Sequence, residues 1–403
     1  MRNVHVGNQR KSRLVSGLVG AGLTALGLSG SLALTGCDTG ASSTPVAAAQ
    51  SGAASHRQLA YFMLVDGRMG VADVLDGLKS VQTVKIGHYG VHQVAVLPDN
   101  RTIYTGNGDT KKIVKVTISE DGKSHTIKEI ADTPANLHLF AANPGGSKVV
   151  MSSRLELKDT VVVPPSGLPD DMLVVIDTAT DTIEKTLNLP SPAMVEFSPD
   201  GKTCFVSNVH HQSVSVVDTA SWTVKDTWSV SQGGPMIKPN GELTISPDGL
   251  AASPDGKWVA TADYDLHSVS VFEVANPANR RQVDYTKAPF NGVLPHDVRF
   301  SPDSKEIWVV DFAKHPDPGN EASNASIPTN IRVFDVATLE LKRTIKAPVM
   351  VERTSLPQYA ANSAYLTTAV GGVVEIDRKS GNAVNQIVVG GVGTPVVCGM
   401  AMY

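Results

Sequence analysis

The chain has 403 residues, of which 35 are Lys or Arg and 39 are Asp or Glu, and its formal net charge is −4. No basic stripe stands out against this acidic excess, so the composition argues against a nucleic-acid-binding protein.

The first 36 residues have the pattern of a secretory signal peptide. Their charged side chains are all basic (Arg2, Arg10, Lys11 and Arg13), and an apolar, glycine-rich run follows up to Leu34. The run closes on Leu34-Thr-Gly-Cys37, which resembles the bacterial lipobox. The resemblance implies that Cys37 is lipidated and becomes the mature N-terminus. The alternative is a plain transmembrane anchor, since the run is long enough to span a bilayer, but it is rich in Gly and Ser and ends at the cysteine.

Residues 37–57 are predicted to be the lipidated cysteine and a flexible tether. Residues 38–56 contain almost no bulky apolar side chain, so they cannot bury enough surface to offset chain entropy. Two or three acyl chains would anchor the protein firmly to a membrane. The expected location is therefore the cell envelope, with residues 58–403 facing the periplasm or the cell exterior.

The remaining residues contain a repeat at spacings of about 45–58 residues. A short turn sequence recurs four times. Its Pro fixes φ at the start of the turn, its Asp side chain can hydrogen-bond to the backbone of the turn, and the residue after the Asp tolerates a positive φ. The four copies are Val96-Leu-Pro-Asp-Asn100, Phe197-Ser-Pro-Asp-Gly201, Ala252-Ser-Pro-Asp-Gly256 and Phe300-Ser-Pro-Asp-Ser304. Alternating strands such as SVSVVD (213–218) and SVSVFE (268–273) follow. The pattern predicts four-stranded antiparallel meanders, and such meanders arranged radially form a β-propeller.

These turn sequences resemble the YVTN-type β-propeller repeats. That superfamily also includes the haem d1 domain of cytochrome cd1 and lactonase-like proteins. The expected fold is all-β, with seven four-stranded antiparallel blades over residues 58–403. Six blades are predicted over residues 88–131, 132–189, 190–230, 231–288, 289–347 and 348–391. The seventh, blade 1, combines three N-terminal strands with the C-terminal segment Pro395–Met402, which closes the ring and removes exposed sheet edges.

One face of such a propeller is expected to carry the functional site. If the strands of a blade are named A to D from the centre outwards, the D–A connections and B–C loops share one face, here called the loop face. The A–B and C–D turns share the opposite face, here called the turn face. The three long insertions, predicted at 153–171, 231–247 and 312–330, all fall on the loop face, and such lengthening is how a scaffold builds a binding site.

Histidines gather on the loop face as well. The residue six positions before the turn proline begins strand A beside the central channel. That position holds His92 in blade 2, His138 in blade 3, Ala193 in blade 4, Asp248 in blade 5 and His296 in blade 6; in blade 7, where Tyr359 replaces the proline, the same count gives Arg353. One interpretation is that the histidines cap strand ends through backbone hydrogen bonds. The other is a channel mouth that binds a metal, haem or an anionic ligand. Because blades 2 and 3 are neighbours, His92 and His138 are the candidate ligands of a divalent metal.

Three functions remain open on these observations. The first is a binding module that holds a small ligand or a partner protein through His92, His138, His296, Asp248 and Arg353. The second, implied by the haem d1 relatives, is a redox or cofactor-handling protein with haem or a metal. The third, implied by the lactonase-like relatives, is a hydrolase or lyase in which a histidine at the channel mouth acts as acid or base beside Asp248 or Arg353. Fold resemblance alone does not choose among them.

Overall fold

The computed structural model describes thirteen stretches of the chain. They are residues 58–64, 66–75, 77–88, 93–133, 137–153, 171–231, 243–290, 293–312, 330–346, 358–360, 362–368, 372–388 and 400–402. The chain divides into two compact units, Met1–Ala54 and Ser55–Tyr403, and every described residue belongs to the second. The predicted signal peptide, Cys37 and the tether therefore lie outside the described residues. Within the described stretches, no helix has the length and apolar character needed to cross a membrane.

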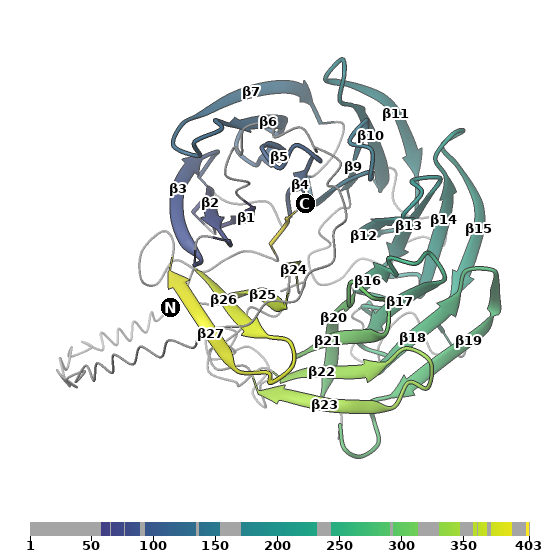
Figure 1. Ribbon diagram of the computed structural model, residues 1–403. Helices are drawn as coiled ribbons and strands as arrows, with labels where there is room; N and C mark the ends of the chain where they lie inside the picture. The colour runs from purple at the N-terminus through teal and green to yellow at the C-terminus, as the bar shows by residue number, and fades with distance from the viewer. Residues whose placement is uncertain are drawn as a thin grey trace, which may run out of the picture. The chain divides into compact units, whose positions relative to one another are not determined.

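Strands dominate the second unit, and they form seven antiparallel sheets arranged as blades around a centre (Figure 1). Blade 1 contains β1 (Leu59–Met63), β2 (Arg68–Asp73) and β3 (Lys79–Lys85). Blade 2 contains β4 (Ala95–Val96), β5 (Thr102–Asn107), β6 (Lys112–Ile118) and β7 (His125–Asp132). Blade 3 contains β8 (Leu139–Ala142), β9 (Lys148–Ser153), β10 (Met172–Asp177) and β11 (Thr182–Asn188). Blade 4 contains β12 (Pro192–Phe197), β13 (Thr203–Asn208), β14 (Ser213–Asp218) and β15 (Thr223–Ser229).

The last three blades follow the same order from strand A to strand D. Blade 5 contains β16 (Gly249–Ala252), β17 (Trp258–Asp263), β18 (Ser268–Glu273) and β19 (Asn276–Asp284). Blade 6 contains β20 (Leu294–Phe300), β21 (Glu306–Phe312), β22 (Asn330–Asp335) and β23 (Leu341–Lys346). Blade 7 contains β24 (Gln358–Ala360), β25 (Ser363–Thr368), β26 (Gly372–Asp377) and β27 (Ala383–Val388). The predicted fold class, a seven-bladed all-β propeller, is confirmed.

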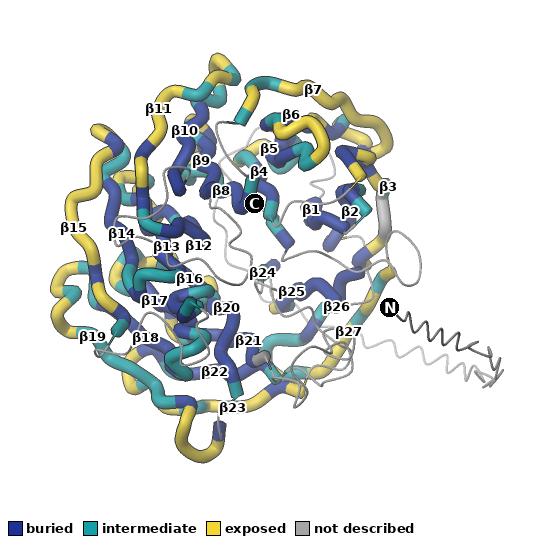
Figure 2. The backbone as a smooth tube through the Cα atoms, turned by 180° about the vertical axis from the view of Figure 1, so that it is seen from behind, coloured by how far each residue is buried: buried dark blue, intermediate teal, exposed yellow. Residues whose placement is uncertain are grey.

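The apolar core lies between the blades. Strands B and C are almost wholly buried, because each blade packs both of its faces against its neighbours, whereas the outer D strands are largely exposed (Figure 2). In blade 4, for example, Phe205 on β13 packs near Trp228 on β15, and Trp228 in turn stacks on Phe272 of blade 5 at a centroid distance of 5.4 Å. Burying such aromatic surface between blades is the main favourable contribution to this fold.

The C-terminus closes the ring, as predicted. The backbone N–H of Tyr61 on β1 donates to the carbonyl of Ala401, and the N–H of Ala401 donates back to Tyr61, both at 2.9 Å. Met400 is fully buried against Phe62 and Leu64 of blade 1. The C-terminal segment therefore supplies the innermost pairing that β1 would otherwise lack, and this pairing covers a free sheet edge.

The A–B turns adopt the conformation that their sequence predicts. The residue after the turn aspartate has a positive φ of 52° at Asn100, 69° at Gly201 and 71° at Gly256. In blade 6 a serine takes this place: Ser304 has a φ of 58°, and its hydroxyl oxygen accepts a 3.0 Å hydrogen bond from the N–H of Asp255 in blade 5. The turns therefore stabilise neighbouring blades against each other on the turn face.

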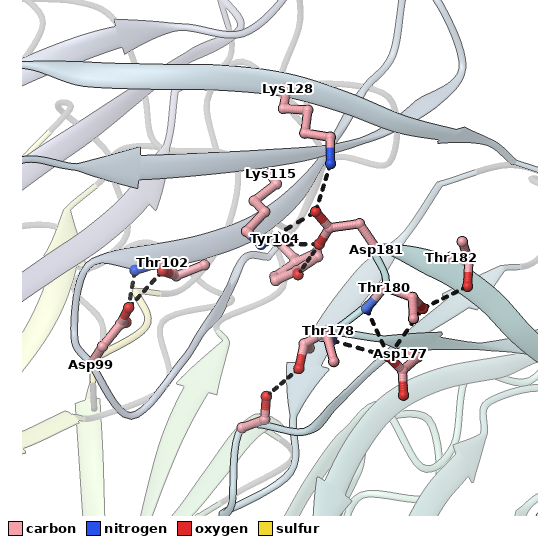
Figure 3. A network of polar contacts seen from close by, with 12 residues as sticks. Asp99, Thr102, Tyr104, Lys115, Lys128, Asp177, Thr178, Thr180, Asp181 and Thr182 are labelled. Carbon is pink, nitrogen blue, oxygen red and sulfur yellow. Dashed lines mark hydrogen bonds and ion pairs between the residues drawn. The ribbon is translucent and has the colours of Figure 1, made fainter.

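Polar contacts near the outer rim join successive blades at six junctions. In each, a side chain on strand D of one blade reaches the C–D turn of the next. The pairs are Gln82–Gly122, Lys128–Asp181, Lys185–Ser221, Arg281–Ala337, Arg343–Arg378 and Asn385–Gly77. At the junction of blades 2 and 3, the Asp181 carboxylate also accepts hydrogen bonds from Tyr104 at 2.6 Å and Lys115 at 3.0 Å (Figure 3).

Of the two cysteines that follow the predicted lipidation site, Cys204 is described. Cys204 is a free thiol in the core between blades 3 and 4, and burial raises its pKa well above the usual range. Cys398 lies outside the described residues. The buried thiol of Cys204 therefore behaves as a small apolar side chain.

Candidate functional site

The loop face carries the starts of the A strands and the B–C turns. In blade 2 these two segments contact each other: Nδ1 of His88, which precedes strand A, lies 2.8 Å from a carboxylate oxygen of Asp109 in the B–C turn. The two segments therefore share one face. Most of each predicted insertion (residues 154–170, 232–242 and 313–329) lies outside the described residues. The described part of this face therefore consists of the strand ends and turns that flank those segments in the chain.

The structure describes three of the five predicted binding residues. His138 is 7% exposed and lies at the start of blade 3, just before β8. Asp248 and His296 lie at the starts of blades 5 and 6, and His296 is also 7% exposed. His92 and Arg353 lie outside the described residues. The proposed metal pair of His92 and His138 cannot therefore be placed, and the described residues contain no group of three or more His, Cys, Asp or Glu side chains suited to a metal ion.

The structure brings Asp248 and His296 together across the junction of blades 5 and 6. The Nε2 atom of His296 lies 3.1 Å from Oδ2 of Asp248, and its Nδ1 atom lies 3.6 Å from Oδ2 of Asp297. The edge of Tyr264 packs against the imidazole at a centroid distance of 5.6 Å. The imidazole is therefore held between two carboxylates with an aromatic ring beside it. We call this group of His296, Asp248, Asp297 and Tyr264 the histidine cluster.

A β-bulge directs His296 into this position. The pairing of β20 with β21 shifts register between Pro295 and Asp297, so His296 has no partner residue on β21. A bulge bends the strand and turns a side chain away from the regular alternation. A register shift also occurs between Pro192 and Val195 in blade 4, around the equivalent residue Ala193. The bulge therefore recurs at this position in blade 4, where the residue is an alanine.

Gly249 permits the close approach of the two blades. A Cβ atom at this residue would lie 2.5 Å from the carbonyl oxygen of His296 and 3.0 Å from the Cα of Asp297. Both contacts are with backbone, which cannot move aside as a flexible side chain can. Glycine at the first residue of β16 therefore allows Asp248, the preceding residue, to reach the imidazole.

The segment that carries Asp248 is fixed to two blades. The N–H of Ser246 donates to the carbonyl of Val209 in blade 4, and the N–H of Ile245 donates to the carboxylate of Asp265 in blade 5. The N–H of Asp248 itself donates to Ala262 at 2.9 Å. These backbone bonds leave the Asp248 carboxylate free to orient toward His296 without ordering a flexible loop.

Burial dominates the electrostatics of Asp297. Its side chain is almost fully removed from solvent, which raises its pKa; His296 opposes this shift, and the charge of Asp248 adds to it. A neutral imidazole has one donor and one acceptor nitrogen, whereas the protonated ring has two donors. The 3.1 Å contact with Asp248 places Nε2 of His296 within hydrogen-bond distance of a carboxylate, an arrangement that can orient an imidazole for proton transfer.

Sequence reasoning missed three members of this arrangement. Asp297 follows His296 directly in the chain, so the His-Asp pair is visible in the sequence, but regular strand alternation would point the two side chains to opposite faces. The bulge that changes this leaves no reliable sequence signal. Tyr264 and Gly249 come from blade 5, and their proximity to His296 depends on how tightly two blades pack.

Comparisons with known proteins agree with the architecture. Residues 173–314 match the family model described as lactonase, seven-bladed β-propeller, and this stretch includes all four residues of the histidine cluster. A protein of unknown function from Desulfotomaculum acetoxidans DSM 771 has a similar structure, with a TM-score of 0.62 and 13% identity over 85% of this chain and 98% of that chain. Hydrazine synthase of Kuenenia stuttgartiensis has a TM-score of 0.52 and 19% identity over 72% of this chain and 77% of that chain. At these identities the likeness to solved structures shows the fold alone, and the findings together agree with a lactonase-like propeller superfamily.

Proposed function

We propose that the protein is a lipid-anchored, extracytoplasmic propeller that binds a small polar ligand on its loop face, with His296 at the centre of the site. The observation that supports this most strongly is the 3.1 Å contact between His296 and Asp248, which joins two blades. Two carboxylates beside the imidazole disfavour an anionic ligand by charge repulsion. The described residues therefore favour a neutral or cationic ligand with hydroxyl or amine donors.

A ligand screen tests this proposal. The full chain would be titrated with neutral polyols, amines and lactones, and binding detected as a rise in melting temperature. His296→Gln should abolish the response, and Asp248→Asn should weaken it. His210→Gln is the matched control, because His210 lies on the same face but bonds the carbonyl of Thr244 at 3.2 Å rather than a carboxylate. A ligand whose affinity is equal in all four proteins would contradict the proposal.

A second candidate is a lactonase-type hydrolase. The family match over residues 173–314 favours it, because the matched stretch carries Asp248, His296 and Asp297. In this mechanism the imidazole would take a proton from water as it attacks the lactone carbonyl, while a carboxylate orients the ring. Acid release from a lactone panel, followed at constant pH, should then fall at least about 100-fold in His296→Gln. Binding without turnover would leave the first proposal in place and exclude this one.

The cofactor-handling alternative and the lipid anchor remain predictions. The absorption spectrum and elemental analysis of the purified protein would detect haem or a divalent metal directly. For the anchor, Cys37→Ser should abolish labelling by palmitate and leave unprocessed or soluble protein. Continued labelling of that variant would exclude Cys37 as the lipidated residue.

A further inference from the structure

The centre of the propeller contains a second cavity, distinct from the histidine cluster. Its volume is about 440 Å³, and residues from the inner strands of all seven blades line it. The lining reaches Pro254 and Pro302 of the A–B turns, so the cavity extends toward the turn face, and neither His296 nor Asp248 borders it. A cavity of this size falls within the range of small-molecule sites.

An ion pair lines this cavity. The guanidinium of Arg299 on β20 donates a hydrogen bond of 2.5 Å to Oε1 of Glu196 on β12. The two strands belong to blades 6 and 4, so the pair reaches past the inner strand of blade 5 (Figure 1). Each side chain keeps 19% of its surface exposed, and both line the cavity. The pair therefore presents one positive and one negative group to the same small space.

The positions of the pair are equivalent in the repeat. Each residue lies three positions before the turn proline of its blade, and the corresponding residues of blades 2 and 3 are Ala95 and Ala141. These alanines also line the cavity. The lining therefore combines small apolar side chains with one positive and one negative group.

We propose that this channel cavity binds a small zwitterion with an apolar side chain, such as a free α-amino acid. The ligand carboxylate would pair with Arg299, whose planar guanidinium can donate hydrogen bonds to both carboxylate oxygens, and the ammonium would pair with Glu196. The apolar side chain would lie along Ala95 and Ala141. The ligand would thus insert between two opposite charges that already face each other. This inference does not depend on the ligand proposed for His296.

Calorimetry with matched probes tests the inference. Leucine should bind the full chain, whereas 4-methylpentanoate, which lacks the ammonium, and 3-methylbutylamine, which lacks the carboxylate, should each bind at least tenfold more weakly. Arg299→Gln and Glu196→Gln should each reduce the affinity for leucine at least tenfold. Asp248→Asn, at the loop face, should leave it unchanged. Equal affinity for the three probes, or no heat of binding for leucine at 10 mM, would overturn the proposal.

A further variant separates ligand binding from folding. Ala141→Leu adds bulk to the apolar part of the lining without touching the ion pair, so it should abolish leucine binding while the melting temperature stays within a few degrees of the wild type. If Ala141→Leu binds leucine as the wild type does, the cavity is not the site. If Arg299→Gln and Glu196→Gln melt at lower temperature but bind leucine normally, the ion pair only stabilises the packing of blades 4 and 6, and the proposal is wrong.

Discussion

Oδ2 of Asp248 lies 3.1 Å from Nε2 of His296 because the inner strands of blades 5 and 6 touch at Gly249. The two side chains begin equivalent strands in consecutive repeats, so the propeller symmetry places them at the same level. The β-bulge at His296 then turns the imidazole toward blade 5. The contact therefore depends on backbone geometry as much as on the two side chains.

The close approach of these strands predicts that Gly249→Ala disturbs the histidine cluster. The added Cβ would lie 2.5 Å from the carbonyl oxygen of His296, so the backbone must shift. We expect a loss of about 1–3 kcal/mol in the free energy of unfolding and weaker binding at the loop face. Urea denaturation measures the first effect. Gly145→Ala is the control, since a Cβ there meets no atom within 4 Å; equal stability of the two variants would argue against a tight contact at Gly249.

The junction of blades 2 and 3 predicts an energetic coupling between Tyr104 and Asp181. The Tyr104 hydroxyl donates a 2.6 Å hydrogen bond to the Asp181 carboxylate, which also accepts bonds from Lys115 and Lys128. A double-mutant cycle of Tyr104→Phe and Asp181→Asn should give a coupling of about 1–2 kcal/mol. Asparagine tolerates the positive φ of 58° at this residue, so the turn is retained. Lys128→Ala should cost less than about 1 kcal/mol because that side chain is mostly exposed.

Ring closure predicts a large cost for Met400→Ala. Met400 is fully buried against blade 1, and its loss leaves a cavity beside the pairing of Tyr61 with Ala401. We expect destabilisation of about 2–5 kcal/mol. Truncation before Pro395 should be still more severe, because it removes both backbone bonds to Tyr61. A truncated chain with the wild-type melting temperature would refute closure by the C-terminal segment.

Because the carboxyl group of Asp263 is buried, we predict that the free energy of unfolding falls as the pH rises. Burial raises its pKa from 3.8 to about 7, although the hydroxyls of Ser268 and Ser270 donate hydrogen bonds to it. Between about pH 4 and pH 7 the unfolded chain has lost this proton while the folded chain retains it, so unfolding releases a proton and becomes easier as the pH rises. Asp263→Asn should remove this dependence and stabilise the protein above pH 7, by roughly a few kcal/mol.

A carboxylate with a lowered pKa supplies the control for that experiment. Burial alone would raise the pKa of Asp99, but hydrogen bonds from Thr102 and Arg101 outweigh it and lower that pKa. The contribution of Asp99 to stability is therefore present at neutral pH and is lost as the pH falls. Asp99→Asn should therefore destabilise the protein at pH 7 and have little effect in acid. Denaturation midpoints at several pH values measure both variants. A parallel pH dependence in wild type and Asp263→Asn would contradict the assignment of the slope to Asp263.

The architecture could be predicted from the sequence because each repeat depends on interactions between residues that are close together in the chain. The turn sequences fix positive φ at residues such as Gly201 and Gly256, and alternation fixes the strands that follow. The site depends on relations between blades. The repeat placed Asp248 and His296 on one face, but their contact requires the bulge at Pro295–Asp297 and the approach at Gly249, which are set by packing. The ion pair of Glu196 with Arg299 was likewise missed, since it joins residues of two non-adjacent blades.

The most direct test of the loop-face site is the nitrogen NMR spectrum of the histidine side chains during titration with the ligand that gives the largest thermal shift. The chain has 11 histidines. The spectra of the His296→Gln and His88→Gln variants, each lacking the signals of one histidine, assign the signals of these two residues. We predict that the His296 signals move in proportion to occupancy, because the bound ligand replaces or reorients the contact with Asp248. The signals of His88, which is exposed at blade 2 beside Asp109, should stay in place. Unchanged His296 signals at saturating ligand would contradict the account.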